Sequence, residues 1–223
     1  DGSPAGEKTF ILYNPSVGDG GRSVHSVTKD LLLASVESGC RTLCFTLTRR
    51  LAEVIAARSR EVPGISAYRA GYLPTVRRAI EDAAKDGSLR GVVTTNALEL
   101  GIDIGSLDGV IISGYPGTMI SFRQQAGRAG RRLGESFAVL VGFENPLDQY
   151  FMRHPEEFFS RPCEHAVVDT ENPYILSGHL LCAASELPVD PKRDARWFGP
   201  DIAEMLAALE RVCLLRKASR GWI

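Results

Sequence analysis

Short apolar runs rich in β-branched residues alternate with helix-like stretches, and this alternation constrains the fold more than any other feature. The expected strands are residues 10–14, 42–46, 64–66, 91–95, 109–113 and 137–143. The expected helices between them are residues 22–38, 51–59, 74–85 and 121–129. Runs such as GVVTT and GVIIS suit strands that are covered on both faces. The pattern predicts an α/β fold with a parallel sheet and helices on both faces.

The pattern changes after residue 145, where the chain becomes helical and poor in strands. Helices are expected over residues 174–186, after the start signal Asn172-Pro173, and from 200 to about 212. The last ten residues have the alternation and turn residues of a hairpin. We therefore expect two regions, an α/β domain over residues 1–145 and a helical accessory region over residues 146–223.

Composition excludes some classes of protein. Hydrophobic residues make up 44% of the chain and charged residues 24%, which is too apolar for general disorder. The longest apolar runs fall far short of the roughly 20 residues that span a bilayer. The N-terminus lacks the apolar core of a signal peptide. We expect a cytoplasmic protein, associated with the nucleoid if it is bacterial, with no membrane partner.

Charge and cysteine content are less decisive. The formal net charge of −1 does not indicate a nucleic-acid partner, but local arginine clusters and helix N-termini hold phosphates on neutral proteins. The five cysteines include no second close pair, so reduced thiols are expected here rather than a zinc site.

The segment QQAGRAGRR, residues 124–132, carries the strongest chemical signal. In a helix, Gln124, Arg128 and Arg131 share one face, and two guanidiniums with an amide suit the oxygens of a polyphosphate. Each of its two glycines costs roughly 0.5–1 kcal/mol in a helix relative to alanine, which indicates close backbone approach. Charge alone favours a solvated arginine-rich helix, whereas the repeated G-R-x-G-R pattern favours phosphate binding.

A second segment, TTNALELGIDIGSLDGVI, begins at Thr94. A buried strand is expected to end at Thr95, and ligands of open α/β sheets bind at the carboxyl ends of strands. Thr95 is therefore placed to offer a hydroxyl and an amide to a phosphate. Asp103, beside Gly101, is placed to accept a hydrogen bond from a ribose hydroxyl; the alternative is that Asp103 only caps a turn.

A third and weaker segment, FTLTRRLAE, is a strand followed by a threonine-rich helix start. Thr46 and Thr48 either cap this helix, which is the commoner use, or present its N-terminal amides to a phosphate.

Taken in chain order, the segments FTLTRRLAE, TTNALELGIDIGSLDGVI and QQAGRAGRR resemble motifs IV, V and VI of the superfamily two helicases, which include the DEAD-box and DEAH-box enzymes. The resemblance covers about residues 8–145 and implies a RecA-like fold, the second motor domain of such an enzyme. It implies that Arg128 and Arg131 reach the γ-phosphate of ATP held by the first motor domain. Arg131 is expected to be the arginine finger, and Gln124 is expected to contact the γ-phosphate or the attacking water.

The same resemblance carries over further roles. It maps the motif V glycine and aspartate of the nucleotide site to Gly101 and Asp103. The motif V threonine that touches the nucleic-acid backbone maps to Thr95, and we expect Thr94, the helix start near Thr46 and the loop at Arg69 to grip the same strand. Contacts of this kind read phosphates rather than bases, so little sequence preference is expected.

Three longer segments, AYRAGYLPTVRRAIE, ISGYPGTMISFRQQAGRAGR and NPYILSGHLLCAASELP, resemble the DNA helicases of the RecQ-four-like, MrfA and SftH group. That resemblance implies 3′-to-5′ unwinding of single-stranded or tailed duplex DNA. Members of the group continue into a winged-helix region and a four-cysteine zinc domain. Residues 173–212 are therefore expected to begin a partial winged helix, and zinc is expected only in a domain beyond this chain.

An ATPase needs a phosphate loop, G-x-x-x-x-G-K-[ST], and a carboxylate pair such as D-E-x-H, and this sequence has neither. Residues 5–9, AGEKT, are superficially similar, but a glutamate separates the glycine from the lysine. We expect ATP and Mg²⁺ to be bound mainly by a first motor domain upstream of Asp1. The chain alone is then expected to be inactive in hydrolysis, and the whole protein to be a monomer.

Three alternatives stay open. The shared motifs also suit an RNA helicase or a double-stranded DNA translocase. A catalytically silent nucleic-acid-binding module has the same fold, but it has no need of both Arg128 and Arg131. A flavodoxin-like small-molecule binder is disfavoured because no glycine-rich fingerprint follows the first strand.

Overall fold

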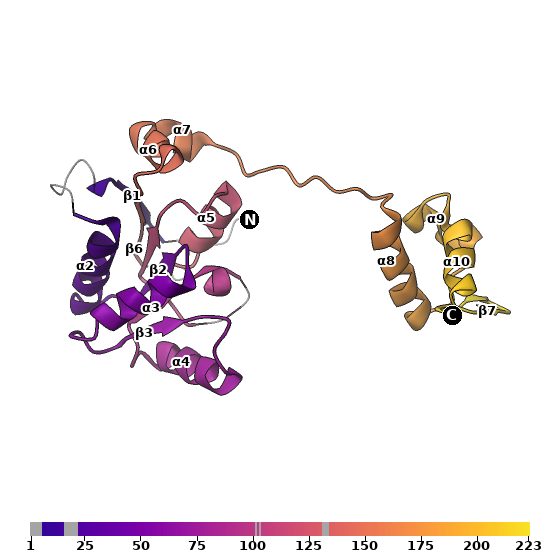
Figure 1. The fold of residues 1–223 in the computed structure, drawn as a ribbon, viewed down its shortest axis with the longest axis horizontal. Coiled ribbons are helices and arrows are strands. Elements are labelled where there is room, and N and C mark those ends of the chain that lie inside the picture. The colour runs from indigo at the N-terminus through magenta and orange to yellow at the C-terminus, as the bar shows by residue number, and fades with distance from the viewer. Residues whose placement is uncertain (1–5, 16–21, 101, 103, 131–133) are drawn as a thin grey trace. The chain divides into compact units, whose positions relative to one another are not determined.

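The computed structural model describes residues 6–15, 22–100, 102, 104–130 and 134–223 (Figure 1). The chain divides into two compact units, Asp1–Glu164 and His165–Ile223. Two hydrophobic clusters stabilise the first unit and a third stabilises the second.

A six-stranded sheet, parallel throughout, forms the centre of the first unit. The strands lie in the order β1-β6-β5-β2-β4-β3. The two strands of this sheet that come last in the sequence, β5 and β6, therefore lie between β2 and β1, with β6 beside β1 and β5 beside β2. Their bounds are β1 (Lys8–Tyr13), β2 (Thr42–Thr46), β3 (Ile65–Tyr68), β4 (Gly91–Thr94), β5 (Gly109–Ser113) and β6 (Ser136–Val141). The predicted parallel sheet is confirmed.

Side chains alternate between the two faces of the sheet, as strand geometry requires. In β2, Leu43 and Phe45 join one hydrophobic cluster and Cys44 joins the other. Burial raises the pKa of the Cys44 thiol to about 12, so this cysteine stays protonated and packs as a small apolar side chain. The central strands are apolar on both faces because helices cover both.

The helices of the first unit are divided between these faces. Two helices supply the apolar residues that cover the Cys44 face: α2 (Val24–Glu37) and α3 (Arg49–Arg58). The opposite face packs against residues of α4 (Pro74–Asp86), α5 (Met119–Ala126), α6 (Pro146–Arg153) and α7 (Pro155–Ser160). A short 3-10 turn, Asn96–Leu98, follows β4.

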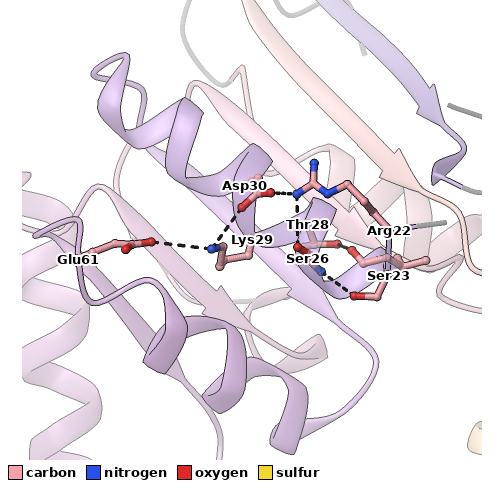
Figure 2. Close-up of polar contacts among 8 residues, drawn as sticks. Arg22, Ser23, Ser26, Thr28, Lys29, Asp30 and Glu61 are labelled. Atoms are coloured by element: carbon pink, nitrogen blue, oxygen red, sulfur yellow. Dashed lines mark hydrogen bonds and ion pairs between the residues drawn. The ribbon is translucent and has the colours of Figure 1, made fainter. Parts of the chain in front are cut away.

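Polar contacts order the beginning of α2, as Figure 2 shows. The hydroxyl of Ser23 caps the first turn, and Arg22 forms an ion pair with Asp30. Lys29 lies 3.3 Å from Asp30 and 3.8 Å from Glu61, which follows α3. Exposed ion pairs of this kind contribute roughly 0–1 kcal/mol each, so buried apolar contacts hold α2 in place.

The sequence predicts a domain boundary after residue 145, and that boundary stays a prediction. In the structure, α6 and α7 follow it but belong to the first compact unit, because Phe151 and Phe158 are buried in the cluster of the Leu43 face.

The second unit is a small helical body with a hairpin. Its elements are α8 (Pro173–Glu186), α9 (Pro191–Phe198), α10 (Ile202–Arg211), β7 (Lys217–Ala218) and β8 (Gly221–Trp222). The two strands pair antiparallel, which confirms the predicted hairpin. Helix α9 was not predicted, although Asp190 before Pro191 is a typical helix start and its side chain caps the helix. None of the described helices is long and apolar enough to cross a membrane.

Candidate functional site

Parallel strands end at one edge of the sheet, and a cleft of about 360 Å³ lies at this edge between the ends of β2, β4 and β5. It is lined by the last residue of β2, by loop residues that follow the strands and by α5 with its N-cap: Thr46, Leu47, Thr95, Asn96, Glu99, Pro116, Thr118, Ser121 and Gln125. The fold therefore brings together two of the threonines that sequence reasoning selected as strand contacts, Thr46 and Thr95.

The threonines at this edge differ in their surroundings. The Thr46 hydroxyl donates to the Thr94 carbonyl at 3.0 Å and also lies 3.1 Å from the Thr48 carbonyl, which ties β2 to β4. Thr94 is fully buried, and its Oγ1 has no hydrogen-bond partner among the described residues. Thr95 lines the cleft, while the Thr48 side chain accepts from Leu51 N and caps α3. Capping, the commoner use, is therefore the role of Thr48 in this structure.

Glu99 joins the loop after β4 to helix α5. Its Oε2 accepts from Ser121 Oγ at 2.6 Å and from Gln125 Nε2 at 2.9 Å. Gln125 is only 4% exposed, and it also donates to Ser121 Oγ at 3.1 Å. The loop of motif V and the helix of motif VI are thus linked by side-chain hydrogen bonds at the wall of the cleft.

Arg128 extends the same junction through backbone contacts. Its Nε donates to the Glu99 carbonyl at 3.0 Å and its Nη1 donates to the Ile102 carbonyl at 2.8 Å. The residue is 5% exposed. Hydrogen bonds from a charged donor are stronger than those between neutral groups, and this donor is buried, so the guanidinium holds the motif V loop in place.

The predicted single helix over residues 121–129 was wrong at its carboxyl end. Helix α5 ends at Ala126, Gly127 caps it, and Gly130 has a φ of 76°. Arg128 therefore lies beyond the helix and does not share a helical face with Gln124, which is partly exposed. Three other predicted site residues, Arg131, Gly101 and Asp103, lie outside the described residues.

The structure explains why one of the two motif VI glycines, Gly130, has no side chain. The chain here runs beside the segment before β5, where Ala129 forms a bridge with Leu107 and Gly130 N donates to the Leu107 carbonyl at 3.1 Å. A Cβ on Gly130 would lie 2.4 Å from Ser136 Oγ. The close approach that the sequence indicated is confirmed at this position.

The amino end of α5 is capped by two side chains. Thr118 Oγ1 accepts from Ser121 N at 3.1 Å. The Glu164 carboxylate accepts from Met119 N at 2.6 Å and from Ile120 N at 3.0 Å. These amide hydrogen bonds, the one from Met119 first, lower the pKa of Glu164, and a negative charge is favourable at a helix N-terminus.

Arg69 lies after the edge strand β3 and does not line the cleft of Thr46. Its Nε donates to Glu53 Oε1 at 2.8 Å, and its guanidinium lies 4.7 Å from the centre of the Tyr72 ring. Tyr72 also donates to Glu53 at 2.6 Å. Partial burial, followed by this hydrogen bond, raises the pKa of Tyr72. The side chain of Arg69 is therefore oriented at the end of the sheet, with part of it still exposed.

Sequence reasoning missed Glu99, Ser121, Gln125 and Glu164. The spacing of Ser121 and Gln125, four residues apart on a helix, was a signal that these side chains interact. Their partner Glu99 lies 22 and 26 residues away, and Glu164 lies 45 residues from Met119. No local pattern indicates contacts over such separations.

The described part of the chain contains no group of three or more histidine, cysteine, aspartate or glutamate side chains that could hold a metal ion. The expected zinc domain beyond the chain, and Mg²⁺ with the first motor domain, stay predictions from the resemblance.

Comparison with known families agrees with this geometry. Residues 24–132 match the family described as helicase conserved C-terminal domain. Residues 168–223 match the winged-helix domain of the ATP-dependent helicase HRQ1. The two matches fall on the two compact units, one on each.

Individual relatives extend over almost the whole chain. An uncharacterized ATP-dependent helicase of Bacillus subtilis, YprA, is 40% identical over 97% of this chain and 30% of its own length. The ATP-dependent helicase hrq1 of Schizosaccharomyces pombe is 38% identical over 92% of this chain and 21% of its own length. The chain thus spans less than a third of these relatives.

Solved structures show the same relationship. The helicase MrfA, bound to DNA and AMPPNP, has 40% identity and a TM-score of 0.82, covering 99% of this chain and 32% of its own. The Mycobacterium smegmatis helicase Lhr, with 24% identity and a TM-score of 0.67, supports the fold alone.

The parallel sheet, with motifs IV to VI at its carboxyl edge, defines a RecA-like α/β domain followed by a helical winged-helix region, which confirms the predicted fold class. The chain belongs to the superfamily two helicases, as a C-terminal RecA-like domain of the MrfA and RecQ-four-like type.

Proposed function

We propose that this chain is the second motor domain of an ATP-dependent DNA helicase that unwinds in the 3′-to-5′ direction. In this proposal, a preceding motor domain binds ATP and Mg²⁺, and the present domain completes the pocket. Arg131 is the arginine finger, Gln124 contacts the γ-phosphate or the attacking water, and Gly101 and Asp103 border the ribose. Arg128 belongs to the same nucleotide site.

The observation that carries the proposal is the junction of motifs V and VI at the carboxyl edge of the sheet. Arg128 binds the carbonyls of Glu99 and Ile102, so the described residues that precede Arg131 are tied to those that precede Asp103. The residues that precede the two proposed nucleotide contacts in the sequence are thus held in one junction. An arginine finger accelerates phosphoryl transfer by about 10³–10⁵, because it stabilises the charge of the transition state.

Support for DNA as the bound nucleic acid and ATP as the hydrolysed nucleotide comes from relatives. The MrfA structures are of that helicase bound to DNA and to AMPPNP, whose triphosphate chain resembles that of ATP. In our proposal the strand lies in the cleft beside Thr46 and Thr95, with Thr94 behind it and Arg69 further along the edge. The partners are single-stranded or tailed duplex DNA and the chain's own first motor domain, in a cytoplasmic monomer.

Substituting Arg131→Ala in a protein with both motor domains tests the finger. ATP hydrolysis stimulated by single-stranded DNA should fall by about 10³-fold or more, since the finger acts in the transition state. The dissociation constant for the strand, measured by fluorescence anisotropy, should change by less than about threefold.

Arg78→Ala, which removes an exposed arginine of α4, is the matched control and should leave hydrolysis unchanged. Near-normal hydrolysis in the Arg131→Ala protein would remove the finger assignment.

A further inference from the structure

Glu99 lies where the proposed strand site and the proposed nucleotide site meet. Its side chain lines the same cleft as Thr46 and Thr95, and its carbonyl accepts from Arg128. One residue therefore contacts both regions, the first through its side chain and the second through its backbone.

We propose that Glu99 is a positioning residue that couples occupancy of the strand cleft to the placement of Arg128. This inference rests on the proposed function and assigns a role to a residue of the motif V segment to which the resemblance gave none. A carboxylate repels the phosphates of a strand, so Glu99 is poorly suited to bind the strand itself. Its hydrogen bonds instead point to α5.

The coupling runs through contiguous contacts. A strand that contacts Thr95 and Asn96 presses on the start of the loop that contains Glu99. Glu99 Oε2 passes a displacement to α5 through Ser121 and Gln125, at 2.6 Å and 2.9 Å. The Glu99 carbonyl and that of Ile102 pass it to the Arg128 guanidinium.

Gln125 leaves one buried polar atom of this junction without a partner among the described residues. Its Nε2 donates to Glu99 and Ser121, but its Oε1 is buried without a hydrogen-bond partner among the residues that the structure describes. Buried polar atoms are nearly always paired, and a group left unpaired in one state favours a change to a state that pairs it.

The test measures strand-stimulated ATP hydrolysis in a protein with both motor domains. For Glu99→Ala, kcat at saturating single-stranded DNA should fall about tenfold, within the usual range for coupling between sites. The strand concentration that gives half stimulation should change by less than about threefold. Glu99→Gln should recover most of kcat, because an amide oxygen still accepts from Ser121 and Gln125.

The double substitution of Glu99→Ala with Gln125→Ala should lower kcat no further than Glu99→Ala alone, because both substitutions remove the same hydrogen bond. Glu144→Ala, which removes an exposed glutamate after β6, is the control and should leave kcat unchanged. Amide hydrogen exchange gives a readout independent of hydrolysis: in the unaltered protein, exchange across α5 should slow when single-stranded DNA is added.

Several results would overturn the proposal. Unchanged kcat in Glu99→Ala, or unchanged exchange across α5 on strand addition, shows that no signal passes through this residue. Tighter strand binding with unchanged kcat in both variants shows that Glu99 only repels phosphates. An equal loss of kcat in the alanine and glutamine variants shows that the hydrogen bonds are not the link. If single-stranded DNA does not stimulate ATP hydrolysis in the unaltered protein, the proposed function is wrong, and this inference is wrong with it.

Discussion

The two ends of helix α5 are held by contacts of different kinds. At the carboxyl end, Arg128 and Gln125 are about 95% buried, and their partners come from the loop after β4. At the amino end, the caps are the exposed side chains of Thr118 and Glu164. Buried polar groups cost much when they lose a partner, whereas water replaces the partner of an exposed group. The end of α5 that leads to the proposed finger is therefore the end whose polar contacts cost more free energy to lose.

This comparison predicts that Arg128→Ala has the largest effect on stability. The change leaves the Glu99 and Ile102 carbonyls without their charged donor, and we expect the first unit to lose about 3 kcal/mol. Arg128→Lys should recover only part of it, because one ammonium cannot reproduce the planar fork.

Urea unfolding followed by circular dichroism measures this loss. Both tryptophans, Trp197 and Trp222, lie in the second unit, so tryptophan fluorescence provides an internal control that should not shift. If Arg128→Ala lowers the free energy of unfolding no more than Arg78→Ala does, the buried contacts of Arg128 do not stabilise the first unit as we infer.

Gly130→Ala should have the next largest effect. Its positive φ costs an L-residue roughly 1–2 kcal/mol, and the added Cβ would also meet Ser136 Oγ at 2.4 Å. Gly134→Ala is the matched control, since a Cβ there meets nothing within 4 Å. Equal unfolding midpoints for the two variants would mean that the turn after α5 adapts, and that the carboxyl end is less rigid than we infer.

Glu164→Gln should have the smallest effect at neutral pH. The pKa of Glu164 is lowered by the amides that it accepts from, so its contribution is complete above the usual carboxyl range and is lost as the pH falls through the lowered pKa. The difference in stability between the two proteins should thus be constant near neutral pH and shrink in acid. A difference that grows in acid would show that the charge at this helix end is not stabilising.

Much of the first unit follows from local sequence. The β-branched runs at residues 91–94 and 109–113 form strands because they are apolar on both faces, and glycines such as Gly87 end helices where a left-handed residue is needed. Thr46 and Thr95 lie together at the carboxyl edge of the sheet because parallel strands end together, and their role as strand contacts stays a prediction. The roles of Arg128, Arg131 and Gln124 stay predictions.

Local pattern failed where long-range contacts compete with helical spacing. The helix expected to include Arg128 ends at Ala126, because hydrogen bonds to Leu107, Glu99 and Ile102 reward a turn that continued helix would not allow. The predicted shared face of Gln124 and Arg128 depended on that helix. Hydrophobic periodicity does not reflect the free energy of contacts with distant segments, so it could not predict that the helix ends at Ala126.

The residue order was enough to specify a parallel sheet and its two covered faces, because these depend on hydrophobic periodicity within about ten residues. The link between motifs V and VI required the folded chain. Glu99 meets Gln125, and Glu164 meets Met119, across 26 and 45 residues. The packing of the helices and strands determines which carboxylate accepts from which donor, and that packing is a property of the whole domain.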